Sequence, residues 1–346
     1  MALRVLHLVG SPVSELLCDL SRLYARDCLA STADPLRRES VIAYVTPDGW
    51  WRFPDDLEPE AILAAPAMHL PAAIEHITDL DVDVALPQMF CPPGMTHYRA
   101  LLDVLEIPYL GNAPDVMALT MNKDRARTVV RAAGVAVPDG ELLKRGDQPT
   151  IEVPAVVKPV DVDNSLGVTF VDRADGFAPA LSAAFAHSDE VLVERYVPLG
   201  REVRCGIVVI DGELVCLPLE EYDLDEATKP IRGLDDKLAR TDDGELELVA
   251  KTASRAWIVD VDDGVTEAVW RAARACHVAL GCRHYSLFDF RIDPDGTPWF
   301  LEAGLYCSFA RQSVIATMAA ATGIDTASLL EIGLRDVLVD HLPVVD

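Results

Sequence analysis

An α/β unit followed by α+β lobes is the fold class that the sequence predicts, and three observations support it. Hydrophobic residues make up 50% of the 346 residues, charged residues 25% and aromatic residues 6%, which is typical of a packed globular protein. Strand and helix patterns alternate through roughly the first third of the chain. Later, Asp-Gly turns separate apolar runs, as in antiparallel hairpins. Two or three domains are expected at about 100–200 residues each.

The first unit is expected to contain a parallel, Rossmann-like sheet, because apolar runs alternate in it with amphipathic segments. The apolar run at 4–9 predicts a buried strand, and the turn after it leads into a helix at 15–29. Further strand and helix signals lie at 40–46, 72–77, 82–86 and 98–105, and residues 107–112 predict a closing strand and turn.

The middle of the chain has a different pattern. Residues 115–133 predict one helix that ends at a glycine, and 154–196 predict a small lobe of strands, a glycine-containing loop and a helix. Asp211-Gly212 predicts a hairpin between two alternating apolar runs. The polar segment 220–252 is long for a simple connection, so we expect it to cover an active site.

The C-terminal pattern is strand-rich and closes with a helix. A helix is predicted at 266–280, strands at 286–292 and 298–303 around an Asp-Pro-Asp-Gly turn, and a helix at 313–322. We therefore expect three domains, with divisions of 1–113, 114–200 and 201–346.

The charge of the chain excludes some functions. A formal net charge of −26 argues against nucleic-acid binding, which needs clustered Lys and Arg to neutralise phosphates. No apolar stretch approaches the ~20 residues of a membrane span, and the N-terminus lacks the pattern of a signal peptide. The eight cysteines form no CxxC pair. These features predict a cytoplasmic protein with reduced thiols that acts on small molecules.

Several polar features occur in one order along the chain, although each is weak alone. A helix lysine is usually on the surface, and two carboxylates on neighbouring strands usually line a solvated sheet. The features are Lys123, Lys158-Pro159 after an apolar run, Asn164-Ser165-Leu166-Gly167, Glu194 to Val197, Glu202, and Asp289 with Glu302.

Together these features resemble the ATP-grasp superfamily, and within it the D-alanine–D-alanine ligase-like branch. The likeness covers about residues 80–330 and includes Ile107 to Gly111, Met117 to Lys123 and the Gly200-Arg201-Glu202 turn. It implies an ATP-grasp fold with an N-terminal Rossmann-like domain, a small central lobe and a C-terminal lobe that clamps ATP. It also implies ATP and Mg²⁺ as cofactors, ADP as product, and a homodimer.

The resemblance assigns the ATP site. Lys123 and Lys158 would approach the phosphates from two lobes, and the loop with Ser165 and Gly167 would fold over the γ-phosphate. The adenine edge and the ribose hydroxyls would be held by Glu194, the backbone of Val197, and Glu202.

Asp289 and Glu302 would hold Mg²⁺, which takes one or two carboxylates together with phosphate oxygens. Strand alternation places Arg291 on the face of Asp289, so it would stabilise developing oxyanion charge, or else form an ion pair with Glu302 or another acid. Lys237 occupies the expected place of a loop lysine over the γ-phosphate, and Lys229 competes for that role.

Two departures bear on the substrate. The chain lacks the His-Gly motif of the D-alanine ligases before the Pro-Tyr strand, and Gly304 stands where the family usually has a metal-binding Asn. These segments look like the ligases that join an amino acid such as serine or threonine to mycosporine-glycine. The resemblance implies that the acceptor oxygen on the mycosporine ring is phosphorylated before the amine attacks. We expect the substrate to contact Glu15, Ser308, Arg311 and Ser313.

Two alternatives are compatible with the same ATP-side residues. One is a dipeptide ligase of secondary metabolism that uses ordinary amino acids. The other is a nucleotide-binding protein that has lost turnover, to which Gly304 lends weight. The presence of Lys158, Asp289 and Glu302 together argues against such a loss.

Overall fold

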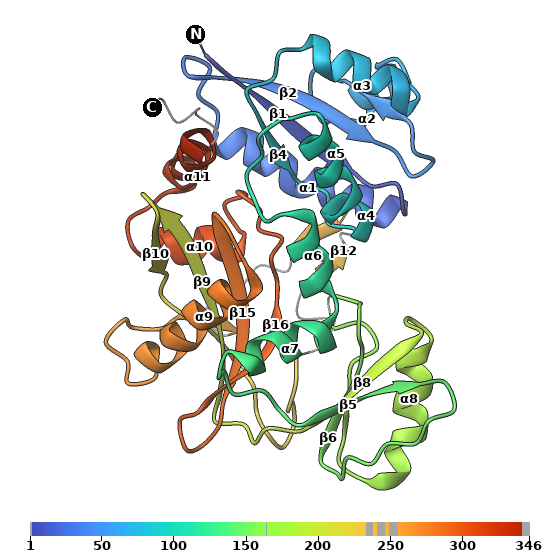
Figure 1. Ribbon diagram of the computed structural model, residues 1–346, viewed down its shortest axis with the longest axis vertical. Helices are drawn as coiled ribbons and strands as arrows, with labels where there is room; N and C mark the ends of the chain where they lie inside the picture. The colour runs from blue at the N-terminus through green and yellow to red at the C-terminus, as the bar shows by residue number, and fades with distance from the viewer. Residues whose placement is uncertain (1, 164, 233–237, 241–245, 249–254, 341–346) are drawn as a thin grey trace.

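The structure is a computed structural model that describes residues 2–163, 165–232, 238–240, 246–248 and 255–340 (Figure 1). It contains three main β-sheets, which lie in the chain order that the sequence predicted. Lys237 lies outside the described residues. The mixed α/β and α+β class is confirmed, whereas the domain divisions at residues 113 and 200 stay a prediction.

The first sheet has the strand order β3-β2-β1-β4, with β1 (Leu3–Gly10) parallel to both of its neighbours. The helix α1 (Glu15–Ser31) begins at Ser14, whose side chain accepts a hydrogen bond from the backbone N–H of Leu17. Gly10 ends β1 at φ +96°, and a Cβ there would lie 2.1 Å from the carbonyl oxygen of Val45. Only glycine therefore fits this close approach. The other elements of this unit are β2 (Arg38–Val45), β3 (Trp51–Arg52), α2 (Pro59–Ala64), α3 (Leu70–Asp79), β4 (Val84–Pro87), α4 (Pro92–Met95) and α5 (His97–Val104).

Two expectations for the next segment are wrong. Residues 107–112 form no strand but a single parallel bridge between Ala85 and Tyr109. The predicted helix 115–133 is two helices, α6 (Pro114–Met121) and α7 (Lys123–Ala132). Asn122 interrupts them at ψ 106°, where its side chain accepts from the N–H of Arg125 and so caps α7. The break places Lys123 at the start of a helix.

The second sheet is antiparallel, with the order β5-β8-β6-β7. It occupies the lower right of Figure 1, where α8 (Phe177–Phe185) packs on it. The apolar strand residues and one face of α8 form a separate small core, which includes Val157, Val193 and Leu181. The elements are β5 (Gly140–Lys144), β6 (Ala155–Pro159), β7 (Thr169–Val171), the 3-10 turn Ala174–Gly176 and β8 (Glu190–Arg195).

The third sheet has the order β14-β11-β9-β15-β16, and β10 pairs with the end of β9. The Asp211-Gly212 hairpin is confirmed, with positive φ at both residues. The bounds are β9 (Arg201–Ile210), β10 (Glu213–Cys216), β11 (Glu220–Tyr222), β14 (Ala256–Ile258), α9 (Thr266–Leu280), β15 (Tyr285–Ile292) and β16 (Pro298–Ala303). One face packs against α9 through Phe288, Phe290 and Phe300. The other face carries the polar side chains of Glu202, Arg204, Asp289 and Arg291 on β9 and β15.

A bulge in β16 interrupts the alternation of faces. Phe290 pairs with Phe300, but Asp289 pairs with Glu302, so Leu301 is an extra residue. Phe300 belongs to the apolar core, and Glu302 would follow it onto that face if the strand were regular. The bulge therefore turns Glu302 to the side of Asp289.

The C-terminal helix α11 (Thr326–Asp340) was not predicted from the sequence, although Leu330, Leu334 and Val337 form an apolar stripe along it. These residues share a core with Val5, Val84 and Leu86 of the first sheet. The first and third sheets are thus packed together through α11 and α10 (Val314–Ala320). No described helix is long and apolar enough to cross a bilayer.

Candidate active site

Two adjoining cavities lie beside the polar face of the third sheet. The small cavity, of about 100 Å³, lies between the second sheet and the polar face of the third. The large cavity, of about 880 Å³, extends from there to α1 and α10. Both cavities are lined by Val162, Arg232 and Glu302. A group held in one cavity can therefore reach a group held in the other.

The small cavity gathers most of the residues that the sequence singled out for ATP. They come from five stretches of chain that are far apart in the sequence. The lining includes Lys123, Lys158, Ser165, Glu194, Val197, Glu202, Asp289, Arg291 and Glu302. Sequence patterns thus found a set of residues that the fold brings together.

Glu194 lies between two cations at the back of this cavity. Lys158 Nζ is 2.5 Å from Glu194 Oε2, and Arg127 Nε is 3.1 Å from Glu194 Oε1. All three side chains are less than 10% exposed. The carboxylate therefore balances two buried charges, in addition to the adenine contact that the sequence predicted for it.

Lys123 reaches the cavity from the N-terminus of α7. Its Nζ donates to the carbonyl of Val162 at 2.5 Å and is 3.9 Å from Glu302 Oε2. Because Val162 belongs to the loop after β6, this bond joins the helix to the second sheet. Lys123 and Lys158 thus line one cavity from two elements, as an oligophosphate site requires.

The loop after β6 has the backbone of a close-fitting turn. Ser165 has φ +58° and lines the small cavity. Gly167 has φ +73°, and a Cβ there would lie 2.9 Å from Pro159 Cγ and 3.0 Å from His187. The glycine therefore lets the loop pack directly onto the end of β6.

Asp289 and Glu302 form the only pair of opposed carboxylates that we assign to a metal among the described residues. Asp289 is 2% exposed, while the Glu302 side chain is 30% exposed and faces both cavities. Carboxylate oxygens are ligands that Mg²⁺ prefers, and two of them beside phosphate oxygens are sufficient. The residues present therefore fit Mg²⁺.

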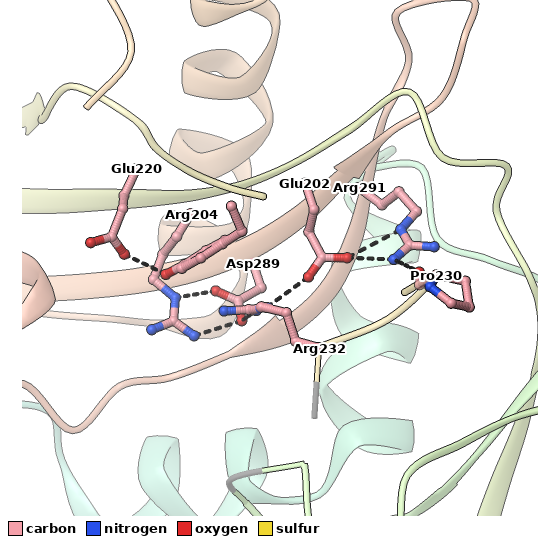
Figure 2. Close-up of polar contacts among 8 residues, drawn as sticks. Glu202, Arg204, Glu220, Pro230, Arg232, Asp289 and Arg291 are labelled. Carbon is pink, nitrogen blue, oxygen red and sulfur yellow. Dashed lines mark hydrogen bonds and ion pairs between the residues drawn. The ribbon is translucent and has the colours of Figure 1, made fainter. Parts of the chain in front are cut away.

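Three arginines neutralise the acids on this face, as Figure 2 shows. Arg204 binds both oxygens of Asp289, and its Nη2 is 2.7 Å from Oδ2. Arg232 spans two acids, with Nε 2.7 Å from Glu202 Oε1 and Nη2 2.5 Å from Asp289 Oδ2. Arg291 Nη2 lies 2.6 Å from Glu202 Oε2. The predicted ion pair of Arg291 thus involves Glu202, and its role toward an oxyanion stays a prediction.

Tyr222 supports this network from β11. Its hydroxyl donates to Glu220, and the guanidinium of Arg232 lies 4.1 Å from the ring centroid. Burial raises the pKa of Tyr222 far above its ordinary value. The ring is therefore a neutral surface against which a cation can stack.

The large cavity is lined mainly by apolar and aromatic side chains, among which cations are placed. Three of the four predicted substrate residues, Ser308, Arg311 and Ser313, line it, but Glu15 does not. Arg311 forms an ion pair with Asp27 of α1 at 3.0 Å, and the hydroxyl of Ser313 donates to the carbonyl of Ser308. Cations at Arg204, Lys229, Arg232 and Arg255 also line the cavity. The site can hold an acid.

Sequence patterns did not single out Arg127, Arg204 or Arg232. Arg204 could have been found, because strand alternation places it on the same face of β9 as Glu202. Arg232 could not, because it lies outside regular structure in the polar segment. Of the two candidate loop lysines, Lys229 lines the large cavity, whereas Lys237 lies outside the described residues.

Known proteins are similar to this chain in sequence. Residues 143–334 match the family model described as "D-ala D-ala ligase C-terminus". The D-alanine–D-alanine ligase of Brucella anthropi is 31% identical over 274 residues, which is 75% of this chain and 82% of that protein. The enzyme of Methylorubrum populi is 31% identical over 270 residues, with the same coverage of 75% and 82%.

Solved structures resemble the whole chain. The VanG D-Ala:D-Ser ligase of Enterococcus faecalis has a TM-score of 0.78 at 22% identity, covering 98% of this chain and 100% of its own. The Coxiella burnetii D-alanine–D-alanine ligase has a TM-score of 0.75 at 20% identity, covering 98% and 95%. At these identities, the likeness establishes the fold alone.

Proposed function

Since the chain belongs to the D-alanine–D-alanine ligase family, we propose that it phosphorylates an acid in the large cavity and joins it to an amino acid there. The chain is an ATP-grasp, ADP-forming C–N ligase that uses ATP and Mg²⁺. We propose the substrates of this chain and the roles of its individual residues as follows.

One observation carries the proposal: the small and large cavities meet at Glu302 and Arg232. Cations and a carboxylate pair occupy the side that suits a metal-bound triphosphate, and the acceptor side is large and mostly apolar. Lys158 and Lys123 would hold the phosphates, and Asp289 and Glu302 the Mg²⁺, which neutralises charge during transfer.

The acceptor oxygen would attack the γ-phosphorus, and the bond to the β–γ bridging oxygen would break, leaving ADP. The amine would then displace phosphate from the activated carbon. Lys229 and the arginines that line the large cavity would orient the carboxylates of the substrates. Closure of the polar segment over the site would keep water from the phosphorylated intermediate.

The leading reading is a dipeptide ligase, because the relatives from Brucella anthropi and Methylorubrum populi are D-alanine–D-alanine ligases. Mycosporine-glycine is the second candidate acceptor. The volume of the large cavity is about 880 Å³. Binding sites for ligands of drug size have volumes of about 300–1,000 Å³. A Cβ on Gly304 would meet no atom within 4 Å, so the cavity is open beside this residue.

The test is phosphate and ADP release across a panel of acceptors, with products identified by mass. The panel contains D-alanine and D-serine, the L-amino acids, and mycosporine-glycine with an amino acid partner. Dipeptide formation supports the leading class. An imine-linked product with absorption at longer wavelength supports the second candidate instead. Formation of AMP, or no nucleotide turnover with any acceptor, contradicts the proposal. The homodimer stays a prediction.

A further inference from the structure

Arg232 lies at the junction of the two cavities. It lines both of them, and its side chain is only 11% exposed. Arg204 lines the large cavity, and Arg291 lines the small one. Among the three arginines of Figure 2, Arg232 is therefore the one placed where a phosphoryl group would pass from ATP to the acceptor.

The two acids that hold Arg232 are the two that a bound nucleotide would use. Its Nε contacts Glu202, which would hold the ribose, and its Nη2 contacts Asp289, which would bind the metal. Metal coordination requires a lone pair of a carboxylate oxygen. Nucleotide and Arg232 therefore compete for the same two carboxylates.

When a nucleotide binds, Arg232 is the arginine that loses its contacts to the two acids. Asp289 Oδ2 accepts from both Arg204 and Arg232, but Arg204 also binds Oδ1 and stands on a central strand. Arg232 has one contact to each acid and belongs to a segment outside regular structure. When Asp289 becomes a metal ligand, Arg204 can keep its bond to Oδ1.

The released guanidinium would stay at the junction. Its stacking on the ring of Tyr222, with 4.1 Å to the centroid, does not involve either acid. Arg291 Nη2 also donates to the carbonyl of Pro230 at 2.8 Å, which anchors the chain two residues before Arg232. The positive charge of Arg232 therefore remains beside the two cavities after Glu202 and Asp289 have bound the nucleotide and its metal.

We propose that Arg232 is a further catalytic residue. Glu202 and Asp289 hold its guanidinium before the nucleotide binds, and nucleotide binding moves the guanidinium to the γ-phosphate. The proposal rests on the proposed function. A planar guanidinium can bind two phosphoryl oxygens and spread the charge that develops as the bond to the bridging oxygen breaks. Arg232 exchanges no proton in this step, because it remains charged throughout.

The test compares the binding of Mg·ADP and Mg·AMPPNP, which differ in the γ-phosphoryl group, by calorimetry. In Arg232→Ala, Mg·ADP should bind several-fold tighter, because the competing cation is gone. The preference for Mg·AMPPNP over Mg·ADP should fall about tenfold or more, which is the effect of a charged hydrogen bond. Arg232→Lys should retain part of that preference.

Arg201→Ala is the matched control. Arg201 lies on the same strand as Glu202 and pairs with Glu221 at 2.5 Å and Asp263 at 2.8 Å, and it lines neither cavity. It should bind both nucleotides as the wild type does. Arg232→Ala should fold, because Glu202 keeps Arg291 and Asp289 keeps Arg204 as partners.

The outcomes separate this proposal from the proposed function. If the wild type binds both nucleotides and Arg232→Ala retains the full preference for Mg·AMPPNP, the role of Arg232 is wrong and the ligase proposal stands. Equal weakening of both nucleotides also overturns the role, since it would indicate only structural support. If the wild type binds neither nucleotide, both proposals fail.

Discussion

Asp289 and Glu302 lie directly opposite each other on β15 and β16, and the strand register shifts at the next residue pair. We predict that Glu302→Ala lowers kcat by about 100-fold or more, because the transferring phosphate loses part of its charge stabilisation. Asp295→Ala is the control, since Asp295 is exposed in the turn of the same hairpin. Thermal unfolding should be similar in both variants, and near-normal turnover of Glu302→Ala would remove the metal assignment.

Glu194→Gln should destabilise the nucleotide-free protein by about 3 kcal/mol, the usual cost of leaving buried charges without their partner. The substitution keeps the side-chain volume but leaves Lys158 and Arg127 facing a neutral amide. Urea denaturation measures the change. Glu190 lies on the same strand as Glu194, and Glu190→Gln, which removes an exposed ion pair to Lys144 of β5, should cost less than about 1 kcal/mol. Equal midpoints for the two variants would contradict the buried role of Glu194.

Lys229→Ala should lower kcat more than it weakens ATP binding, because Lys229 lines the acceptor cavity. Its charge would act on the phosphorylated intermediate or its precursor. Lys237→Ala, made in parallel, tests the lysine favoured by the sequence. Steady-state kinetics with separate nucleotide titrations distinguish the two. A loss of kcat in Lys237→Ala alone would return the role to Lys237.

Folding stability should decrease as the pH falls from about 6.5 to 4, in part because of His7. Burial lowers the pKa of His7 to about 4, despite its hydrogen bond to Gln88. In that window the unfolded chain binds a proton that the folded protein does not bind, so stability rises with pH. The contribution is about 3 kcal/mol. His7→Gln should reduce the slope of unfolding free energy against pH, whereas His97→Gln, at an exposed position, should not. Equal slopes in the two variants would contradict the prediction.

The sequence predicted the parts of the site that depend on local patterns. The Asp-Pro-Asp-Gly turn between two apolar runs places Asp289 and Glu302 on neighbouring strands, and the structure has that hairpin. The apolar run before Lys158 likewise forms β6. Such patterns carry their own geometry, since a hairpin or a strand end is fixed by residues that are close in sequence.

Other parts depended on contacts between distant segments and could not be predicted. The pairing of Arg232 with Glu202 and Asp289 joins three segments, and no local pattern selects that arginine among twenty-four. The break at Asn122 was readable in principle, because Asn is a strong N-cap. The cavity volume follows from packing of whole elements.

The extra residue at Leu301 also bears on how this protein can change in evolution. A regular strand of the same sequence would pair Leu301 with Asp289 and bury Glu302 against Phe288. Loss of Leu301 would instead leave Phe300 in the apolar layer and Glu302 opposite Asp289, so this hairpin can shorten by one residue without exchanging its two faces. Related chains can therefore differ in length here and still share Asp289 and Glu302. A sequence alignment that forbids a gap at Leu301 would misalign one of these two acids.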